Sequence, residues 1–245
     1  MSTRFKWFSV SPMRREELKA ASERFLKEKY VDSKGFGVLL QDVRSNYLNG
    51  QYIEKTIVKE RVVDPFGKET VFEIPQYRTV FFRLASSFPQ LELVNPLRSL
   101  GQFLTFFGDC TDNSTAVEPV IFDLASVCDL LHKDGEQVTV RNASVSNIVL
   151  SNTVSADASI HGEEDVMSSV NSFMGKRKYL FSGTKTTFRL AGEDYCAELS
   201  SSGRVRLLMG DVAKFTGAFR RILGKVAGAA ANDGNGDKPA NEKRQ

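Results

Sequence analysis

The sequence is poor in the residues that build disulfide frameworks, metal sites and membrane spans. It contains 3 cysteines and 2 histidines among 245 residues. Cys110, Cys128 and Cys196 lie far apart and form no CxxC pair, which argues against a disulfide framework and a zinc ribbon and favours reduced, structural thiols. No stretch approaches the roughly 18 uninterrupted apolar residues of a membrane span. We therefore expect a soluble, intracellular protein.

Sequence patterns of common enzymes are also missing. His132 is expected at a helix end and His161 beside a turn, and no cysteine or carboxylate lies at ligand spacing from either. The chain has no HExxH, GxSxG or P-loop pattern. We expect a protein that is not an enzyme and that uses neither a metal nor another cofactor.

The overall composition is that of a globular protein. Hydrophobic residues make up 41% and charged residues 26% of the chain, which is enough for one large domain or two joined halves. The net charge of +3 permits a polyanionic partner without requiring one. The distribution of the cations must therefore decide the class of partner.

One internal repeat organises the chain. The string FRLA, five variable residues and LEL spans Phe82–Leu93, and FRLA, five variable residues and AEL recurs at Phe188–Leu199, an offset of 188 − 82 = 106 positions. Gln41-Asp42-Val43 and Ser146-Asn147-Ile148-Val149 precede the two copies by nearly equal distances. The offset far exceeds that of solenoid repeats and indicates a duplicated α+β unit.

The expected elements form four segments. Residues 1–36 are an extension with a strand at 5–10 and a helix at 13–30. The first repeat, 37–135, has a turn at Asn49-Gly50 and a strand favoured over a helix at 100–107. Its other elements are a strand at 38–47, a helix at 52–59, strands at 61–63, 70–74, 78–85 and 90–94, and a helix at 118–133.

The second repeat spans 136–226, and residues 227–245 are an expected disordered tail because they have nothing to bury. The repeat's elements are a strand at 138–160 bent near 151–152, a helix at 163–174, strands at 178–181, 184–191, 195–200 and 204–209, and a helix at 211–226. Each repeat therefore reads β-α-β4-α. Two such units can close into one sheet with a pseudo-two-fold axis.

That duplicated order resembles the TATA-box-binding protein family over about residues 38–226. Where the family opens each repeat with Gln-Asn-Ile-Val or Gln-Asn-Met-Val, this chain has Gln41-Asp42-Val43 and Asn147-Ile148-Val149. Phe81-Phe82-Arg83-Leu84 stands for Ile-Met-Arg-Ile, and Ser202-Gly203-Arg204 for Ser-Gly-Lys. The resemblance implies an α+β saddle: an antiparallel sheet whose concave face binds the DNA minor groove, with helices on the convex face.

The positions that contact DNA in this family are altered. The four wedging phenylalanines fall on Tyr77, Val94, Phe181 and Ser200, the asparagine pair on Asp42 and Asn147, and the threonines that border the groove on Thr105 and Met209. An ionised Asp42 only accepts hydrogen bonds, so the minor-groove acceptors N3 and O2 repel it. We expect weakened TATA specificity, most like that of the divergent TATA-binding-protein-related factors of trypanosomatid protists.

Further positions follow from the resemblance. Arg83 and Arg189 match phosphate-contacting arginines, Arg98 and Arg204 match the turn lysines, and Val43 and Val149 would line the groove. The alternative is that the arginines are merely solvated and the valines are core. Transcription factors dock on the convex side in this family, where the last helix carries the expected partner-binding residues Lys214, Arg220, Arg221 and Lys225.

The resemblance implies a nuclear basal transcription initiation factor. Its expected partners are double-stranded promoter DNA, other general transcription factors of the preinitiation complex and a small-nuclear-RNA-gene activating complex. We expect no membrane and no small-molecule substrate. Two alternatives stay open: a saddle-fold adaptor that no longer touches DNA, consistent with Asp42 and Ser200, and a helix-grip protein that binds a small ligand or lipid.

Overall fold

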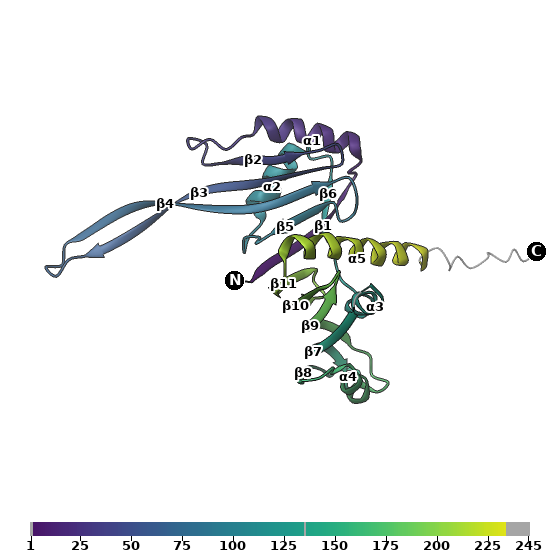
Figure 1. Cartoon of the computed structure of the whole chain (residues 1–245). Helices are drawn as coiled ribbons and strands as arrows, with labels where there is room; N and C mark the ends of the chain where they lie inside the picture. The colour runs from purple at the N-terminus through teal and green to yellow at the C-terminus, as the bar shows by residue number, and fades with distance from the viewer. Residues whose placement is uncertain (1, 135, 234–245) are drawn as a thin grey trace, which may run out of the picture. The chain divides into compact units, whose positions relative to one another are not determined.

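The computed structural model describes residues 2–134 and 136–233. The chain divides into two compact units (Figure 1). Arg4–Val120 form what we call the N-terminal unit, and Ile121–Gln245 with Met1–Thr3 form the C-terminal unit. Both units combine antiparallel strands with helices, so the α+β class expected from the sequence is confirmed.

The N-terminal unit is a sheet with two helices. Its strands follow the order β2-β3-β4-β5-β1, with β6 pairing β1, and neighbouring strands are antiparallel. The elements are β1 (Thr3–Ser11), α1 (Arg15–Lys27), β2 (Phe36–Val43), β3 (Tyr47–Val63), β4 (Glu69–Ala85), β5 (Leu91–Val94), α2 (Gly101–Cys110) and β6 (Ala116–Pro119).

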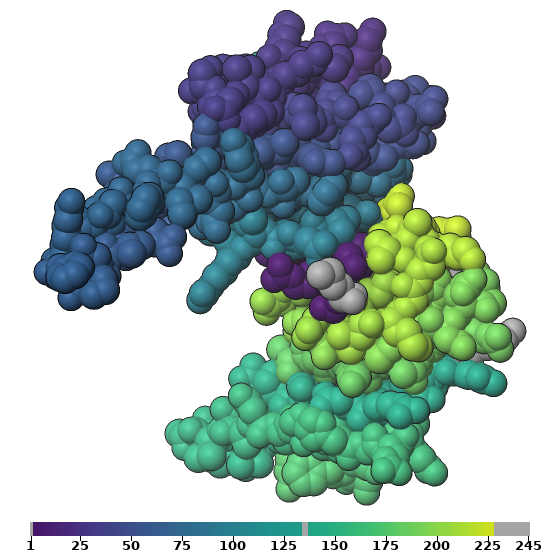
Figure 2. Space-filling view, turned by 60° about the vertical axis from the view of Figure 1, so that its left-hand side comes forward, coloured from purple at the N-terminus to yellow at the C-terminus, as the bar shows by residue number. Residues whose placement is uncertain are grey.

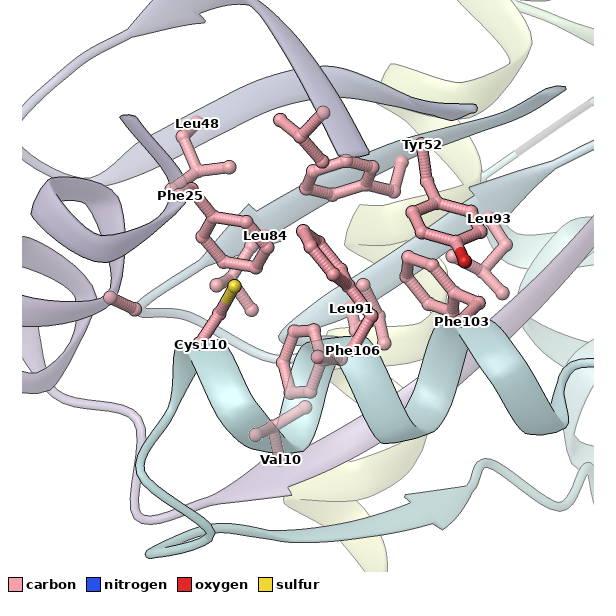
Figure 3. Packing of buried hydrophobic residues seen from close by; sticks show 14 of the residues in the cluster. Val10, Phe25, Leu48, Tyr52, Leu84, Leu91, Leu93, Phe103, Phe106 and Cys110 are labelled. Carbon is pink, nitrogen blue, oxygen red and sulfur yellow. The ribbon is translucent and has the colours of Figure 1, made fainter. Parts of the chain in front are cut away.

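Both helices of this unit cover the same face of the sheet. The rings of Phe25 from α1 and Phe103 from α2 lie 5.5 Å and 5.8 Å from the ring of Phe82 in β4. Phe103 also lies 5.5 Å from Tyr52 of β3 (Figure 3). Full burial of each such side chain contributes about 1.5–3 kcal/mol. Alternate residues of each strand point to the other face, which no helix in the described part of this unit covers.

The C-terminal unit has the strand order β11-β10-β9-β7-β8. Phe215 of α5 packs 5.7 Å from Tyr195 of β10, and Cys128 of α3 and Val170 of α4 join Val140 of β7 in one core cluster. The elements are α3 (Leu124–Asp134), β7 (Glu136–Val149), β8 (Ser155–His161), α4 (Met167–Met174), β9 (Leu180–Leu190), β10 (Glu193–Ser200), β11 (Arg204–Met209) and α5 (Val212–Asp233).

Two predicted features of the first repeat are wrong because strand pairing overrides local signals. Residues 52–59, expected as a helix, are the middle of β3, which pairs with β4 along its whole length. The expected turn at Asn49-Gly50 also lies within β3. Gly50 is needed there for a close approach, since a Cβ would meet the Phe82 ring and the Leu40 side chain at 3.1 and 3.0 Å.

The predicted strand at 100–107 is the helix α2. Phe103, Phe106, Phe107 and Cys110 are buried at helical spacing. The expected helix at 118–133 divides into β6 and α3, and the expected strand at 138–160 into the hairpin β7-β8. The expected strands at 61–63, 70–74 and 78–85 belong to one long hairpin of β3 and β4. Helix α5 continues to Asp233, through part of the expected disordered tail, and residues 234–245 lie outside the described residues.

The repeat motif has only partly equivalent places in the two units. Arg83 and Arg189 both lie opposite an acid of the next strand, Glu92 and Asp194. In the second copy Ala191-Gly192 makes a two-residue turn, so AEL pairs with residues 184–186 and not with FRL. The order β-α-β4-α runs from β1 to α2 in the N-terminal unit, whereas β7 to α5 run β-β-α-β-β-β-α.

Candidate nucleic-acid interface

The sheet face of the C-terminal unit opposite its helices is polar and exposed. Strand alternation produces it: Thr184, Thr186 and Phe188 of β9 point to the core, and Lys185 and Arg189 point outward. We call this surface the polar face. Its members are Asn142, Ser144, Ser159, His161, Gly183, Lys185, Thr187, Arg189, Asp194, Cys196, Glu198, Ser200, Arg204, Arg206 and Met209.

The polar face is arranged in rows across the strands. One row runs through Arg206, Glu198, Lys185, Asn142 and His161. The next row runs through Arg204, Ser200, Gly183, Ser144 and Ser159. Because Gly183 has no side chain, the sheet is hollowed there, with a volume of about 270 Å³ between Ser144, Lys185 and Glu198. Hydroxyl and amide groups thus surround the depression together with the Lys185 ammonium and the Glu198 carboxylate.

The cations of the polar face differ in how they are neutralised. Arg206 lies 3.5 Å from Glu198, and Arg189 lies 3.6 Å from Asp194. Arg204 donates from Nε to Ser202 Oγ at 3.1 Å. Among the residues that the structure describes, neither Lys185 nor Arg204 has an acidic partner. These two are therefore the cations best placed to contact an added anion.

The chemistry of the polar face is that of a binding surface. Its donors are ammonium, guanidinium, hydroxyl and amide groups, which bind phosphate and sugar oxygens. Within residues 2–134 and 136–233, no group of three or more histidine, cysteine or acidic residues is arranged to hold a metal ion. His161 contacts Asn142 at 2.6 Å and Ser159 at 3.0 Å through its ring nitrogens.

Four predicted DNA-contacting residues of the second repeat lie on the polar face: Arg189, Ser200, Arg204 and Met209. Phe181 does not, since it packs inward against the core beside Val145. Asn147 sits in a β-bulge with φ of 56°, and its backbone N–H donates to Asp157. Val149 is exposed at the end of β7.

In the N-terminal unit, Arg83 and Asp42 belong to a network on the helix-free face. The guanidinium of Arg83 lies 3.7 Å from the centre of the Tyr47 ring and donates to Asn49 Oδ1 at 3.4 Å. Asp42 accepts from Tyr47 at 2.8 Å and pairs with Arg44 at 2.9 Å. Both predicted residues thus lie on the helix-free face, and protein groups already engage them.

Tyr77 lies on the same face, but it is held by a second cluster. Its hydroxyl donates to Asp32 at 3.2 Å, and Tyr30 and Lys55 also donate to Asp32, at 3.0 and 2.5 Å. The bonds from Lys55 and Tyr30 lower the pKa of Asp32 below its usual 3.8, and the bond to Asp32 raises the pKa of Lys55. A tyrosine anchored in this way is not a free wedge.

The remaining predicted contacts of the first repeat are scattered. Val94 is half-buried in β5 beside Phe81, on the helix-free face. Val43 is exposed at the end of β2, opposite the core residue Leu48. Arg98 lies in the loop before α2. Thr105 is on the exposed side of α2, so its assignment to a groove-facing strand is wrong.

The predicted partner-binding cations lie along α5. Lys214 pairs with Glu193 at 2.5 Å, and Arg220 donates to the carbonyl oxygen of Thr216 at 3.1 Å. Arg221 and Lys225 are exposed. Part of this positive charge is therefore already neutralised inside the unit.

Sequence reasoning missed the centre of the polar face, Lys185, Arg206, Asn142, Ser144 and Gly183. The available signal was the alternation in Thr184–Leu190, where every second residue is polar or charged on one side. Only strand pairing shows that Lys185 and Asn142 are neighbours, because they are 43 positions apart in the sequence (185 − 142).

Comparison with known proteins assigns no family. No protein-family model matches the chain, and no curated protein matches it. In the described part of the chain, every helix is too short or too polar to cross a membrane.

Proposed function

We propose that this protein binds double-stranded DNA through the helix-free faces of its antiparallel sheets and acts in the nucleus as a basal transcription initiation factor. The observation that carries the proposal is the polar face, where Lys185 and Arg204 flank a hollow lined by Ser144 and other polar groups. The polar face has four cations, Lys185, Arg189, Arg204 and Arg206, against two acids, Asp194 and Glu198. This excess of positive charge, with the hydroxyl and amide groups, suits a duplex, because phosphates supply affinity and groove edges accept hydrogen bonds.

The proposed binding is weakly specific for sequence. Lys185 and Arg204 would contact phosphates, which position the protein without reading bases. Ser200 and Met209 take the places of residues that would wedge into or border the groove, and Asp42 is held by Arg44 and Tyr47. With few groups left to unstack or read base pairs, affinity should depend more on salt than on sequence.

The finer parts of the proposal rest on the TATA-box-binding-protein resemblance. They are a duplicated saddle, recruitment of other general factors and a small-nuclear-RNA-gene activating complex through α5, and weakened TATA reading. Support comes from the matched arginines Arg83 and Arg189, which each lie opposite an acid of the next strand. The exposed Arg221 leaves a cation on α5 for an acidic partner.

The double variant Lys185→Ala/Arg204→Ala tests the phosphate contacts. We expect its affinity for a fluorescently labelled duplex to fall by at least tenfold, and the slope of log affinity against log salt to become shallower by about 1.8, or 0.9 per lost contact. Fluorescence anisotropy across a salt series measures both quantities.

The matched control is Lys19→Ala/Lys27→Ala. It removes two exposed cations from α1, which lies on the side of the sheet opposite the helix-free face of the N-terminal unit. It lowers the net charge equally and should retain the slope of the unmodified chain. Equal losses in both double variants would contradict a binding site on the polar face and indicate only general charge attraction.

A further inference from the structure

The distal part of the β3-β4 hairpin projects from the body of the N-terminal unit. We call residues 56–76 the arm, which stands clear of the body in Figures 1 and 2. Its tip is a built turn: Asp64 Oδ1 accepts from the backbone N–H groups of Phe66 and Lys68 at 2.9 and 2.8 Å. This turn presents Phe66 with 95% of its surface exposed.

One side of the arm is an uncovered continuation of the core-facing side of the sheet. Val58 pairs with Ile74, and Phe72 and Val62 lie on the same side of the two strands, as does Glu60, which pairs with Phe72. In the body this side carries Tyr52, which α2 covers. Beyond α2 these four arm residues remain 44–50% exposed. Exposed apolar patches of this kind mark interaction sites, and a two-stranded hairpin alone is marginally stable in water.

The charge of the arm does not suit a polyanion. It has three cations, Lys59, Arg61 and Lys68, against four acids, Glu60, Asp64, Glu69 and Glu73, a net charge of 3 − 4 = −1. Two of the cations already form ion pairs, Lys59 with Glu73 at 3.1 Å and Arg61 with Glu69 at 3.9 Å. The partner that binds the arm is therefore a protein surface and not DNA.

The free edge of β4 is also unsuited to pairing with an added strand. Lys55 donates its backbone N–H to Gly35, away from β4. Strand alternation then directs the backbone of Ile57 and its partner Pro75 outward as well. Pro75 has no N–H to offer at that edge, which disfavours pairing with another strand. The contact should involve the apolar side of the arm and its tip.

A pocket at the base of the arm complements this tip. It has a volume of about 610 Å³, and Tyr52, Phe106 and Phe36 supply its aromatic lining. Glu54 and Asp109 add carboxylates, and the Gln102 amide, turned to face Glu54, donates to its two oxygens at 2.7 and 2.8 Å. The lysines at the pocket are already paired, Lys34 with Glu28 and Lys55 with Asp32. An aromatic group that carries a nearby cation fits this lining.

The tip has that chemistry, because Lys68 follows Phe66 by two residues. It cannot reach the pocket of its own chain, since seven residues of β3, 57–63, separate Thr56 from the turn at the tip and span about 23 Å. We propose that two copies of the chain dimerise by exchanging arms: the Phe66 tip of each copy enters the pocket at the base of the other copy's arm. Lys68 of each tip then faces Glu54 and Asp109 of the other copy.

In this arrangement the two arms lie antiparallel and cover each other's apolar sides. Val58, Val62, Phe72, Ile74 and Phe66 of both copies leave water together. This contact buries on the order of several hundred Å² per copy, which approaches the roughly 800 Å² per partner of a stable interface. Two-fold exchange also closes the assembly, so both tips and both pockets are used.

Sedimentation equilibrium of the full chain tests the dimer. We expect a dimer whose dissociation constant rises at least tenfold, about 1.4 kcal/mol, in Phe66→Ser. The matched control Phe173→Ser removes an exposed phenylalanine from α4 in the C-terminal unit, where Phe173 is 59% exposed, and should leave the dissociation constant unchanged. A chain that sediments as a monomer throughout, or a dimer equally stable in Phe66→Ser, overturns the proposal.

A charge exchange tests the contact itself. Lys68→Glu and Glu54→Lys should each weaken the dimer several-fold, and the double variant should recover most of the affinity, because the swapped charges again attract across the interface. Additive losses in the double variant overturn the assignment of the tip to this pocket. Circular dichroism of each variant checks that the substitutions leave the fold intact.

Discussion

Charged residues on the two helix-free faces differ in how freely they can meet a ligand. Arg83 is stacked on Tyr47, Arg189 lies near Asp194, and Arg204 donates to a serine hydroxyl and has no acidic partner among the described residues. An arginine that must first break an existing contact contributes less to the free energy of binding than one that need not. The sequence identifies Arg83 and Arg189 through their repetition, but it does not show which cation is available.

The hydrogen bonds from Tyr30, Lys55 and Tyr77 to Asp32, here called the Asp32 cluster, show why contacts between individual residues were not predictable. Tyr77 and Asp32 are 45 positions apart, and no local pattern links them. Lys55 joins them because β3 and β4 pair Lys55 with Tyr77. Alternation could predict that Tyr77 faces away from the core, whereas its hydrogen bond depends on the loop before β2.

The same cluster makes a prediction about pH. Because Asp32 has a lowered pKa, its contribution to stability is present above its unfolded value of 3.8 and is lost as pH falls through the lower folded value. The raised pKa of Lys55 has the opposite effect on the pH dependence of stability. The contribution of Lys55 to stability is present below its unfolded value of 10.5 and is lost as pH rises through the higher folded value. In Lys55→Ala the pKa of Asp32 should rise towards 3.8, as measured by carboxyl NMR titration. An Asp32 titration that Lys55→Ala does not alter would contradict this cluster.

Among the elements, α2 and β3 show the limits of local patterns. The apolar run at 100–107 fits either a strand or a helix, and only the burial of Phe103, Phe106 and Phe107 along one side distinguishes them. Residues 52–59 were expected as a helix, but they form a strand because they pair with β4, the next strand of the hairpin. Elements with clear periodicity and turn signals were predicted well: β1, α1, β5, β11 and the start of α5.

The α2 assignment makes a stability prediction. Phe103 is 1% exposed among Tyr52, Phe82 and Phe107, so Phe103→Ala should lower the free energy of unfolding by about 3–5 kcal/mol. Chemical denaturation measures this loss. The neighbouring Thr105→Ala is the control: it lies on the exposed side of α2 and should change the free energy of unfolding by less than about 0.5 kcal/mol and leave DNA affinity intact. A large loss of stability in Thr105→Ala, or none in Phe103→Ala, would contradict the orientation of α2.

At the scale of the whole molecule, each unit places its helices on one side of an antiparallel sheet. Composition and hydrophobic periodicity were sufficient to predict the α+β class. The order of strands in the C-terminal unit was not predictable, because β7 pairs with both β8 and β9 and a sequence does not show which neighbours a strand selects. The arm was not predicted either, because the sequences of its two strands resemble those of the strands in the body of the sheet, and a sequence does not show which strands pair.

The most direct test of the proposed DNA binding is a salt titration of the full chain with a labelled duplex, comparing a TATA-containing sequence with a scrambled one. Several phosphate contacts predict that log affinity falls linearly with log salt, by about 0.9 per contact. Weakened base reading predicts that the two duplexes differ by less than about tenfold, or 1.4 kcal/mol. Absence of duplex binding even at low salt would contradict the account.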